Sequence, residues 1–291
     1  MKKLVQRRLA GAAVMASVAF APVAHAADLG PADKTSVLAP APAGVNWTGF
    51  YIGGNVGYAH STYSASDVTG TASAGMNVGG VPLPLGSGTV GLPSVGAGNG
   101  SFTGGGQIGF NYQIGPTVLG LEADFQGANL NGSLDSNSAI DLGVGPVGIN
   151  SSVSLKTDWY ATVRGRIGHP FGAFLPYVTG GLAIAGTKAQ VTNSTTLTIP
   201  GFGNVGGSAS DSVTKTLTGY AVGAGLEYAL GHGWSIKGEY LHLGFGNQSY
   251  GSATPFSGSL GAGISVSGTT AVHADLKADF DIARVGVNYR F

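Results

Sequence analysis

The segment that most constrains the fold is Ile282–Phe291, in which apolar and polar residues alternate strictly. Successive side chains of a strand point to opposite faces, so this alternation predicts a strand with one apolar face and one charged face. The apolar face carries Ala283, Val285, Val287, Tyr289 and Phe291, and the other face carries Arg284, Gly286, Asn288 and Arg290. A last strand that ends on aromatic residues is typical of outer-membrane β-barrels, where it pairs with the first strand and its aromatic end lies at the membrane interface.

The N-terminus has the pattern of an export signal. Four basic residues fall within the first eight positions, Leu9–Val23 is apolar, and Ala24-His25-Ala26 forms an Ala-x-Ala cleavage site. The alternative is a membrane anchor, but the apolar run is shorter than the roughly 20 residues that a spanning helix needs. We therefore predict a signal peptide over residues 1–26, cleaved after Ala26, and a proline-bearing linker over residues 27–46.

Composition excludes several classes of protein. The chain has no cysteine, and so has no disulfide, thiol nucleophile or cysteine metal site. All 14 acidic residues follow position 26 but only ten basic residues do, so the mature chain carries a formal charge of −4. This balance argues against a nucleic-acid partner, which needs clustered bases. The 52 glycines show no period of three, which excludes a collagen-like chain.

From Trp47 onward, eight alternating segments are each long enough for a tilted membrane strand. They are Trp47–Tyr58, Phe102–Ile114, Thr117–Gln126, Asp158–Pro170, Phe174–Thr187, Leu217–Leu230, Trp234–Phe245 and Ala274–Phe291. Tight turns and long connections alternate between them, as in outer-membrane barrels, whose long loops lie outside the cell. We predict an all-β fold over residues 47–291: an eight-stranded, antiparallel, up-and-down transmembrane β-barrel with both termini in the periplasm.

The long connections are rich in glycine, serine, threonine and asparagine. The connection at 59–101 holds one charged residue, Asp67, and the one at 246–273 holds no acidic residue, lysine or arginine. Such segments bury little apolar surface, so we expect mobile or partly paired tips.

The charged residues of the strands oppose the apolar faces and are predicted to point into the barrel. They are Glu122, Asp124, Arg164, Arg166, Glu227, Lys237, Glu239, Arg284 and Arg290. Eight strands leave room for little more than side chains, and buried charges must be paired. We therefore expect a salt-bridged plug; the alternative is a narrow selective pore lined by the same residues.

Aromatic residues end the apolar faces at both rims and predict interfacial girdles. We place Trp234, Phe171, Tyr289 and Phe291 at the periplasmic rim, and Tyr58, Phe125, Trp159 and Tyr240 at the outer rim. A soluble eight-stranded ligand carrier would instead put its apolar faces inside. Charge alternation alone does not separate the two interpretations, but the alternating connection lengths, the aromatic rims and the terminal Phe291 favour the membrane barrel.

Catalytic and cofactor motifs are weak. Two G-x-G-x-x-G matches, starting at Gly143 and Gly201, lie in glycine-rich connections without the strand and helix that a dinucleotide site needs. The six histidines show no metal-ligand spacing. His242 and Ser249 have no evident acidic partner for acyl-chain chemistry. We expect no enzyme activity, no cofactor and no metal.

Several motifs resemble the small outer-membrane immunogenic protein family of alphaproteobacteria, also called porin-family β-barrels. They are Trp47–Gly57 at the opening strand, Pro176–Ala183, Gly238–Leu241, and Arg284–Phe291 at the closing strand. The resemblance implies that Val285, Val287, Tyr289 and Phe291 act as an assembly signal. It also implies an abundant envelope protein linked to membrane integrity and to host or surface contact, and thus a surface antigen.

We therefore predict an outer-membrane protein, exported through the periplasm, with a structural and surface-exposed role. A narrow diffusion pore for ions or small solutes is the alternative. Outer-membrane lipids and the outer-membrane assembly machinery are the expected partners, because a barrel cannot insert with unpaired strand edges. We expect no periplasmic domain after the last strand, and no feature predicts the oligomeric state.

Overall fold

The structure, a computed structural model, describes residues 45–91, 95–143 and 145–291. The described residues form one compact unit. The predicted signal peptide, its cleavage residues Ala24 and Ala26, and all but the last two residues of the predicted linker lie outside the described residues. Within the described ranges, no helix is long and apolar enough to cross a membrane.

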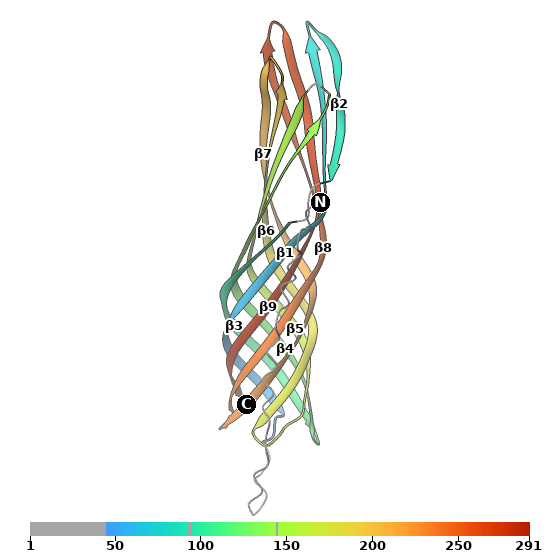
Figure 1. The fold of residues 1–291 in the computed structure, drawn as a ribbon. Helices are drawn as coiled ribbons and strands as arrows, with labels where there is room; N and C mark the ends of the chain where they lie inside the picture. Colours follow the sequence, from blue (N-terminus) through green and yellow to red (C-terminus); the bar gives the residue numbers. More distant parts are fainter. Residues whose placement is uncertain (1–44, 92–94, 144) are drawn as a thin grey trace, which may run out of the picture. The chain divides into compact units, whose positions relative to one another are not determined.

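The described part of the chain folds into nine antiparallel strands (Figure 1). They are β1 (Gly49–Val78), β2 (Val81–Gly91), β3 (Val95–Ile114), β4 (Thr117–Asp141), β5 (Pro146–Gly168), β6 (Phe174–Ile199), β7 (Gly203–Gly231), β8 (Trp234–Gly261) and β9 (Ile264–Arg290).

Eight of these strands close a ring. Strands β3 to β9 pair in chain order, β3 pairs with β1, and β1 also pairs with β9. The pairing of β1 with β9, which closes the ring, begins at Tyr51↔Arg290. Next to it, the amide of Phe291 donates a hydrogen bond to the carbonyl oxygen of Phe50 at 3.0 Å. The predicted eight-stranded barrel is confirmed, and its closing strand is the C-terminal segment. The ninth strand, β2, lies within the first long connection and pairs with β1 from Thr69 onward.

The exterior of the ring is apolar and the charges lie inside. The side chains of Ile52, Leu121, Val163, Leu182 and Val285 are each more than half exposed on the outer face. A soluble carrier would bury these apolar faces inside its barrel. Because they lie on the outside here, the structure favours a lipid-facing barrel over a soluble carrier.

Aromatic residues project outward at both predicted rims. At one rim the rings of Trp234 and Tyr289 lie 5.1 Å apart, and at the other the rings of Phe125 and Trp159 stack at 5.7 Å. This is the arrangement of interfacial girdles.

Above the ring, the strands separate into two facing sheets. Pairing between β3 and β4 stops at Gly104↔Gly127, and pairing between β7 and β8 stops at Gly219↔Phe245. Beyond these two seams, β4 to β7 form one sheet, while β8, β9 and β1, with β3 and then β2 beside β1, form the other (Figure 1). We call the strands beyond the seams the extension.

The long connections continue the strands of the ring, and the extension that they form has an apolar core of its own. Its buried residues are Ala72, Ala74, Ile140, Leu142, Val147, Ile149, Leu197, Val205, Phe256 and Val266, drawn from both sheets. In each connection these residues are sparse and are separated by serine, threonine and glycine. No single hairpin buries them, but two sheets placed face to face do.

We predict that Phe256→Ala loosens the extension and leaves the ring closed. Phe256 is 3% exposed, and truncating a buried phenylalanine costs about 3–5 kcal/mol. Amide hydrogen exchange should accelerate in residues 69–78 and 252–268, while the heat-dependent gel shift of the folded barrel persists. Phe202→Ala, at an exposed position in the turn between β6 and β7, is the matched control. Unchanged exchange in Phe256→Ala would contradict a packed inter-sheet core.

Candidate functional site: the buried charge cluster

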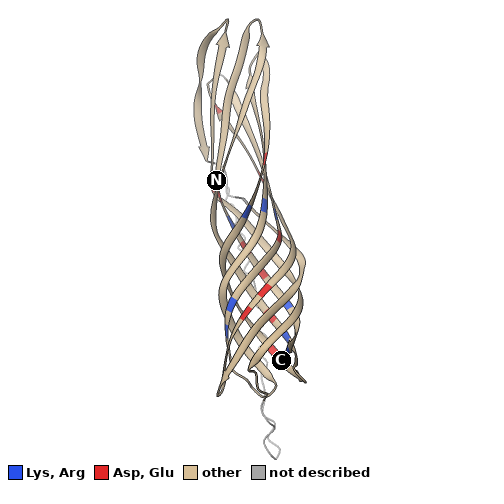
Figure 2. Ribbon diagram, turned by 180° about the vertical axis from the view of Figure 1, so that it is seen from behind, with Lys and Arg blue, Asp and Glu red and all other residues tan. Residues whose placement is uncertain are grey.

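Three adjacent pairs of strands, β4–β5, β7–β8 and β8–β9, bring the predicted interior charges together. Every second side chain of each strand points into the barrel. The strand register then places Glu122 opposite Arg164 and Glu239 opposite Arg284. Glu227 and Lys237 are likewise opposite one another. The cluster consists of Glu122, Asp124, Arg164, Arg166, Glu227, Lys237, Glu239 and Arg284, all buried. Figure 2 shows charged residues gathered in the ring, whereas most of the extension carries none.

Glu122 is the centre of the cluster. Its Oε1 lies 2.6 Å from Nη2 of Arg164, and Nζ of Lys237 lies 2.9 and 2.8 Å from its two oxygens. The hydroxyl of Tyr51 donates to Oε2 at 2.7 Å. One carboxylate therefore ties together β1, β4, β5 and β8.

Two arginines bridge the remaining acidic residues on the same level. Arg164 reaches Oδ2 of Asp124 at 2.7 Å and Oε1 of Glu239 at 3.0 Å. Arg284 reaches the same Oδ2 at 3.1 Å, and its Nε donates to Oε2 of Glu239 at 2.7 Å. Thr162 and Tyr177 donate further hydrogen bonds to Asp124 and Glu239. Multiple charge-assisted bonds of this kind offset the cost of burying each ion.

A second group of contacts lies around Arg166. Its Nη2 lies 2.7 Å from Oε2 of Glu227, and its guanidinium stacks 4.5 Å from the ring centre of Tyr177. Ser235 and Asn288 donate to the other oxygen of Glu227. Arg166 also lies 3.8 Å from Glu122, which connects this group to the centre of the cluster.

The structure leaves one predicted member outside the cluster. Arg290 is only partly buried, and its guanidinium lies 5.1 Å over the ring of Trp47. Including it was wrong, because it is the last residue of β9 and stands at the rim rather than inside the ring. The cluster that remains has four acidic and four basic side chains, so its formal charge is zero.

Apolar layers close the barrel on both sides of the cluster. On the side of the short turns, Trp47, Val118 and Leu175 are fully buried and pack together. On the other side, the next layer contains Tyr63, Leu130, Leu155, Leu217, Leu241, Leu243, Phe245, Phe280 and Ile282. Sequence reasoning missed this layer, although Leu241, Leu243 and Phe245 share the parity of Lys237 and Glu239.

A further difference concerns the outer face. Alternation predicted that every charge of the strands points inside, but Asp281 lies on the outward parity of β9. Its Oδ1 accepts the hydroxyl of Tyr240 at 2.7 Å and lies 2.9 Å from Nδ1 of His242. This polar group lies toward the extension, where a strand leaves the apolar band and an outward carboxylate meets water.

The arrangement holds the wall of the barrel together rather than exposing a reactive group. Each carboxylate of the cluster is engaged by at least one cation, and no group of three potential metal-ligating side chains occurs among the described residues. The contacts cross the lumen between strands distant in sequence, so the cluster links opposite walls.

Comparison with known proteins identifies the family. A family model described as "Outer membrane protein beta-barrel domain" matches residues 35–291. The chain belongs to the outer membrane protein β-barrel family. This places it in the outer membrane and agrees with the apolar exterior and the closed ring.

Members of the outer membrane protein β-barrel family with similar sequences come from alphaproteobacteria, which confirms the resemblance seen in the sequence motifs. The "31 kDa outer-membrane immunogenic protein" of Brucella melitensis is 30% identical over 285 residues, which is 96% of this chain and 98% of the relative. The "22 kDa outer membrane protein" of Rhizobium leguminosarum bv. viciae is 30% identical over 57% of this chain and 64% of its own. Among solved structures, the outer membrane protein OprG from Pseudomonas aeruginosa is similar with a TM-score of 0.35 and 13% identity, covering 84% of this chain and 97% of OprG.

We predict that Glu122→Gln strongly destabilises the barrel, because it leaves Lys237 and Arg164 with less compensation in a buried site. Breaking one partner of a buried ion pair costs about 3–5 kcal/mol. Urea-dependent unfolding of the refolded barrel in lipid vesicles, followed by tryptophan fluorescence, measures the loss.

Asp135→Asn, on an exposed position of the extension, is the control and should change stability by less than about 0.5 kcal/mol. The double variant Glu122→Gln with Lys237→Gln should lose less than the two single losses combined, because the pair is coupled. Strict additivity would show that the two groups do not stabilise each other.

Proposed function

We propose that the protein is a non-conducting outer-membrane barrel whose role is structural and surface-exposed. The observation that carries this proposal is the neutral charge cluster, in which each charged side chain has at least one oppositely charged partner, enclosed between two apolar layers. A conducting lumen needs a continuous path of water past its charged lining. Here the charged side chains form hydrogen bonds with one another across the lumen.

The extension supports the surface-exposed part of this role. In the proposed orientation the short turns face the periplasm and the extension stands outside the cell, as the long segments of outer-membrane barrels do. Its two sheets are built around a packed apolar core and present mostly hydroxyl, amide and glycine surface. A folded structure of this kind offers fixed surface features to other cells, to host molecules or to antibodies.

The proposed partners are the lipids of the outer membrane and the machinery that assembles barrels in it. The apolar outer face requires lipid, and the pairing of β1 with β9 must form before or during insertion because unpaired strand edges are costly in lipid. The mature chain is acidic, which disfavours nucleic acid. No catalytic role is proposed, since the buried carboxylates form ion pairs with lysine and arginine side chains of the protein.

Conductance in a planar bilayer tests this function directly. We expect the refolded mature chain, residues 27–291, to give no discrete openings when its folding is confirmed by the heat-dependent gel shift. Arg164→Ala should unfold at lower urea than the parent protein and remain silent, because the apolar layers still close the barrel. A porin reconstituted in the same bilayer is the positive control.

Steady openings of the parent protein would overturn the proposal and establish the narrow pore instead. In that case the cluster would line the conducting path, and Arg164→Ala would shift ion selectivity without loss of stability. The two functions therefore differ in both the electrical and the unfolding measurement.

A further inference from the structure

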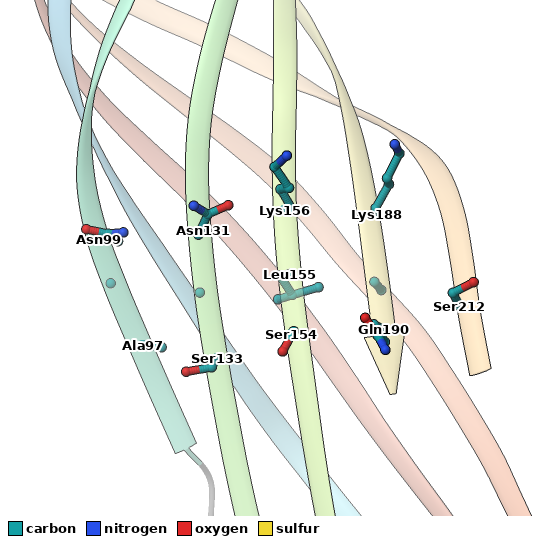
Figure 3. Close-up of a pocket in the computed structure, with 13 residues that line it drawn as sticks. Ala97, Asn99, Asn131, Ser133, Ser154, Leu155, Lys156, Lys188, Gln190 and Ser212 are labelled. Carbon is teal, nitrogen blue, oxygen red and sulfur yellow. The ribbon is translucent and has the colours of Figure 1, made fainter. Parts of the chain in front are cut away.

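The outer surface of the barrel has a concave region where the ring passes into the extension. It extends across β3 to β7 and encloses about 630 Å³. Figure 3 shows the lining side chains standing on neighbouring strands. We call this region the saddle.

Strand register arranges the saddle in two rows of polar side chains. One row places Lys156 between Asn131 and Lys188, which are its partners on β4 and β6. The other row, one step further into the extension, contains Ser133, Ser154, Gln190 and Ser212. Amide and hydroxyl groups in such rows offer hydrogen bonds to a ligand with many hydroxyls, such as a saccharide.

The first row contains a charge conflict. Lys156 and Lys188 are direct cross-strand partners on the same face, and like charges in this relation destabilise a sheet. A single acidic residue, Asp158, forms ion pairs with both lysines. Its carboxylate lies 2.9 Å from Nζ of Lys156 and 3.8 Å from Nζ of Lys188. One positive charge remains in a mature chain that is acidic as a whole. Asp158 compensates only one of the two positive charges, and a local conflict that is left partly uncompensated points to function, here to an anionic ligand.

The side of the saddle toward the ring leads into the lipid-facing surface. Trp159 stacks with Phe125, and the space above Gly186 is filled by the Trp159 indole. Further toward the ring, Val163 and Leu182 are 52% and 72% exposed. An occupant of the saddle thus meets cationic and hydrogen-bonding groups at one end and an apolar, acyl-binding surface at the other.

We propose that the saddle binds the phosphorylated saccharide head of a glycolipid of the outer leaflet. The lysine pair contacts a phosphate, the amide and hydroxyl rows contact the sugars, and the acyl chains lie along the apolar band below Trp159. A soluble anion would satisfy the lysines but would not use the adjoining apolar surface. This inference rests on the proposed orientation, with the extension outside the cell, and is independent of whether the barrel conducts.

The test is a titration of the refolded mature chain in detergent micelles with purified rough lipopolysaccharide, in the presence of EDTA. Binding is followed by tryptophan fluorescence and by counting bound lipid in native mass spectrometry. The variant Lys156→Gln with Lys188→Gln should bind about tenfold or more weakly, since a lysine near an anionic lipid surface contributes about 1 kcal/mol. Lys215→Gln with Lys277→Gln removes the same charge outside the saddle and should bind like the parent protein. The variant Lys156→Arg with Lys188→Arg keeps both charges and should bind like the parent protein.

Three results would overturn the proposal. The first is equal binding by both double glutamine variants, and the second is undiminished binding of dephosphorylated lipopolysaccharide. The third is displacement of the lipid by inorganic phosphate or heparin at concentrations similar to that of the lipid itself, which would assign the saddle to a soluble anion. All variants should keep the heat-dependent gel shift, and a silent or a conducting bilayer leaves these outcomes unaffected.

Discussion

Closure of the ring by β1 and β9 is the constraint on which the rest of the structure depends. In lipid there is no water to satisfy an open strand edge, so the first and last strands must complete each other's hydrogen bonds. The pairing of β1 with β9, which begins at Tyr51↔Arg290, achieves this. Once the ring is closed, alternation along each strand divides the residues between the lipid and the lumen.

The charge cluster follows from that division. Eight strands enclose a lumen too narrow for bulk water, so the inward charges must find partners among themselves. Glu122 contacts cations from β5 and β8, and Arg284 of β9 reaches Asp124 of β4. These contacts join walls that the sheet pairing alone would leave separate. The cluster therefore links the strands of the ring across the lumen, and an apolar layer lies on either side of it.

In the extension, alternation along the strands still divides the residues between two faces, but the surroundings of both faces change. Where β3 separates from β4 and β7 from β8, the two sheets no longer enclose a lumen, and most of their buried inward residues are small or apolar. The outer face changes as well, from the lipid-facing residues of the ring to the lysines, amides and hydroxyls of the saddle. The saddle lies where these two surfaces meet, which is why a lipid headgroup fits its chemistry.

Prediction from the sequence succeeded where alternation was strong and failed where it was sparse. Strands such as the one containing Val163 carry an apolar residue at most outward positions, so their faces were readable without the structure. The inward-facing residues Leu241, Leu243 and Phe245 were overlooked, because charged residues on the same face of the strand suggested that the whole interior of the barrel is polar. Arg290 was placed inside by parity alone, but it is the last residue of β9 and therefore lies at the rim, which alternation does not reveal.

The sequence by itself determined the class of fold, the number of strands in the ring and the identity of most inward charges, because these follow from a period of two and from the placement of turns. Only the tertiary structure decided which charges pair, since that requires the register across strands distant in sequence. It also decided that the glycine- and serine-rich connections fold into facing sheets. Their apolar residues are too few for any one hairpin, and burial becomes favourable only when both sheets contribute to the same core.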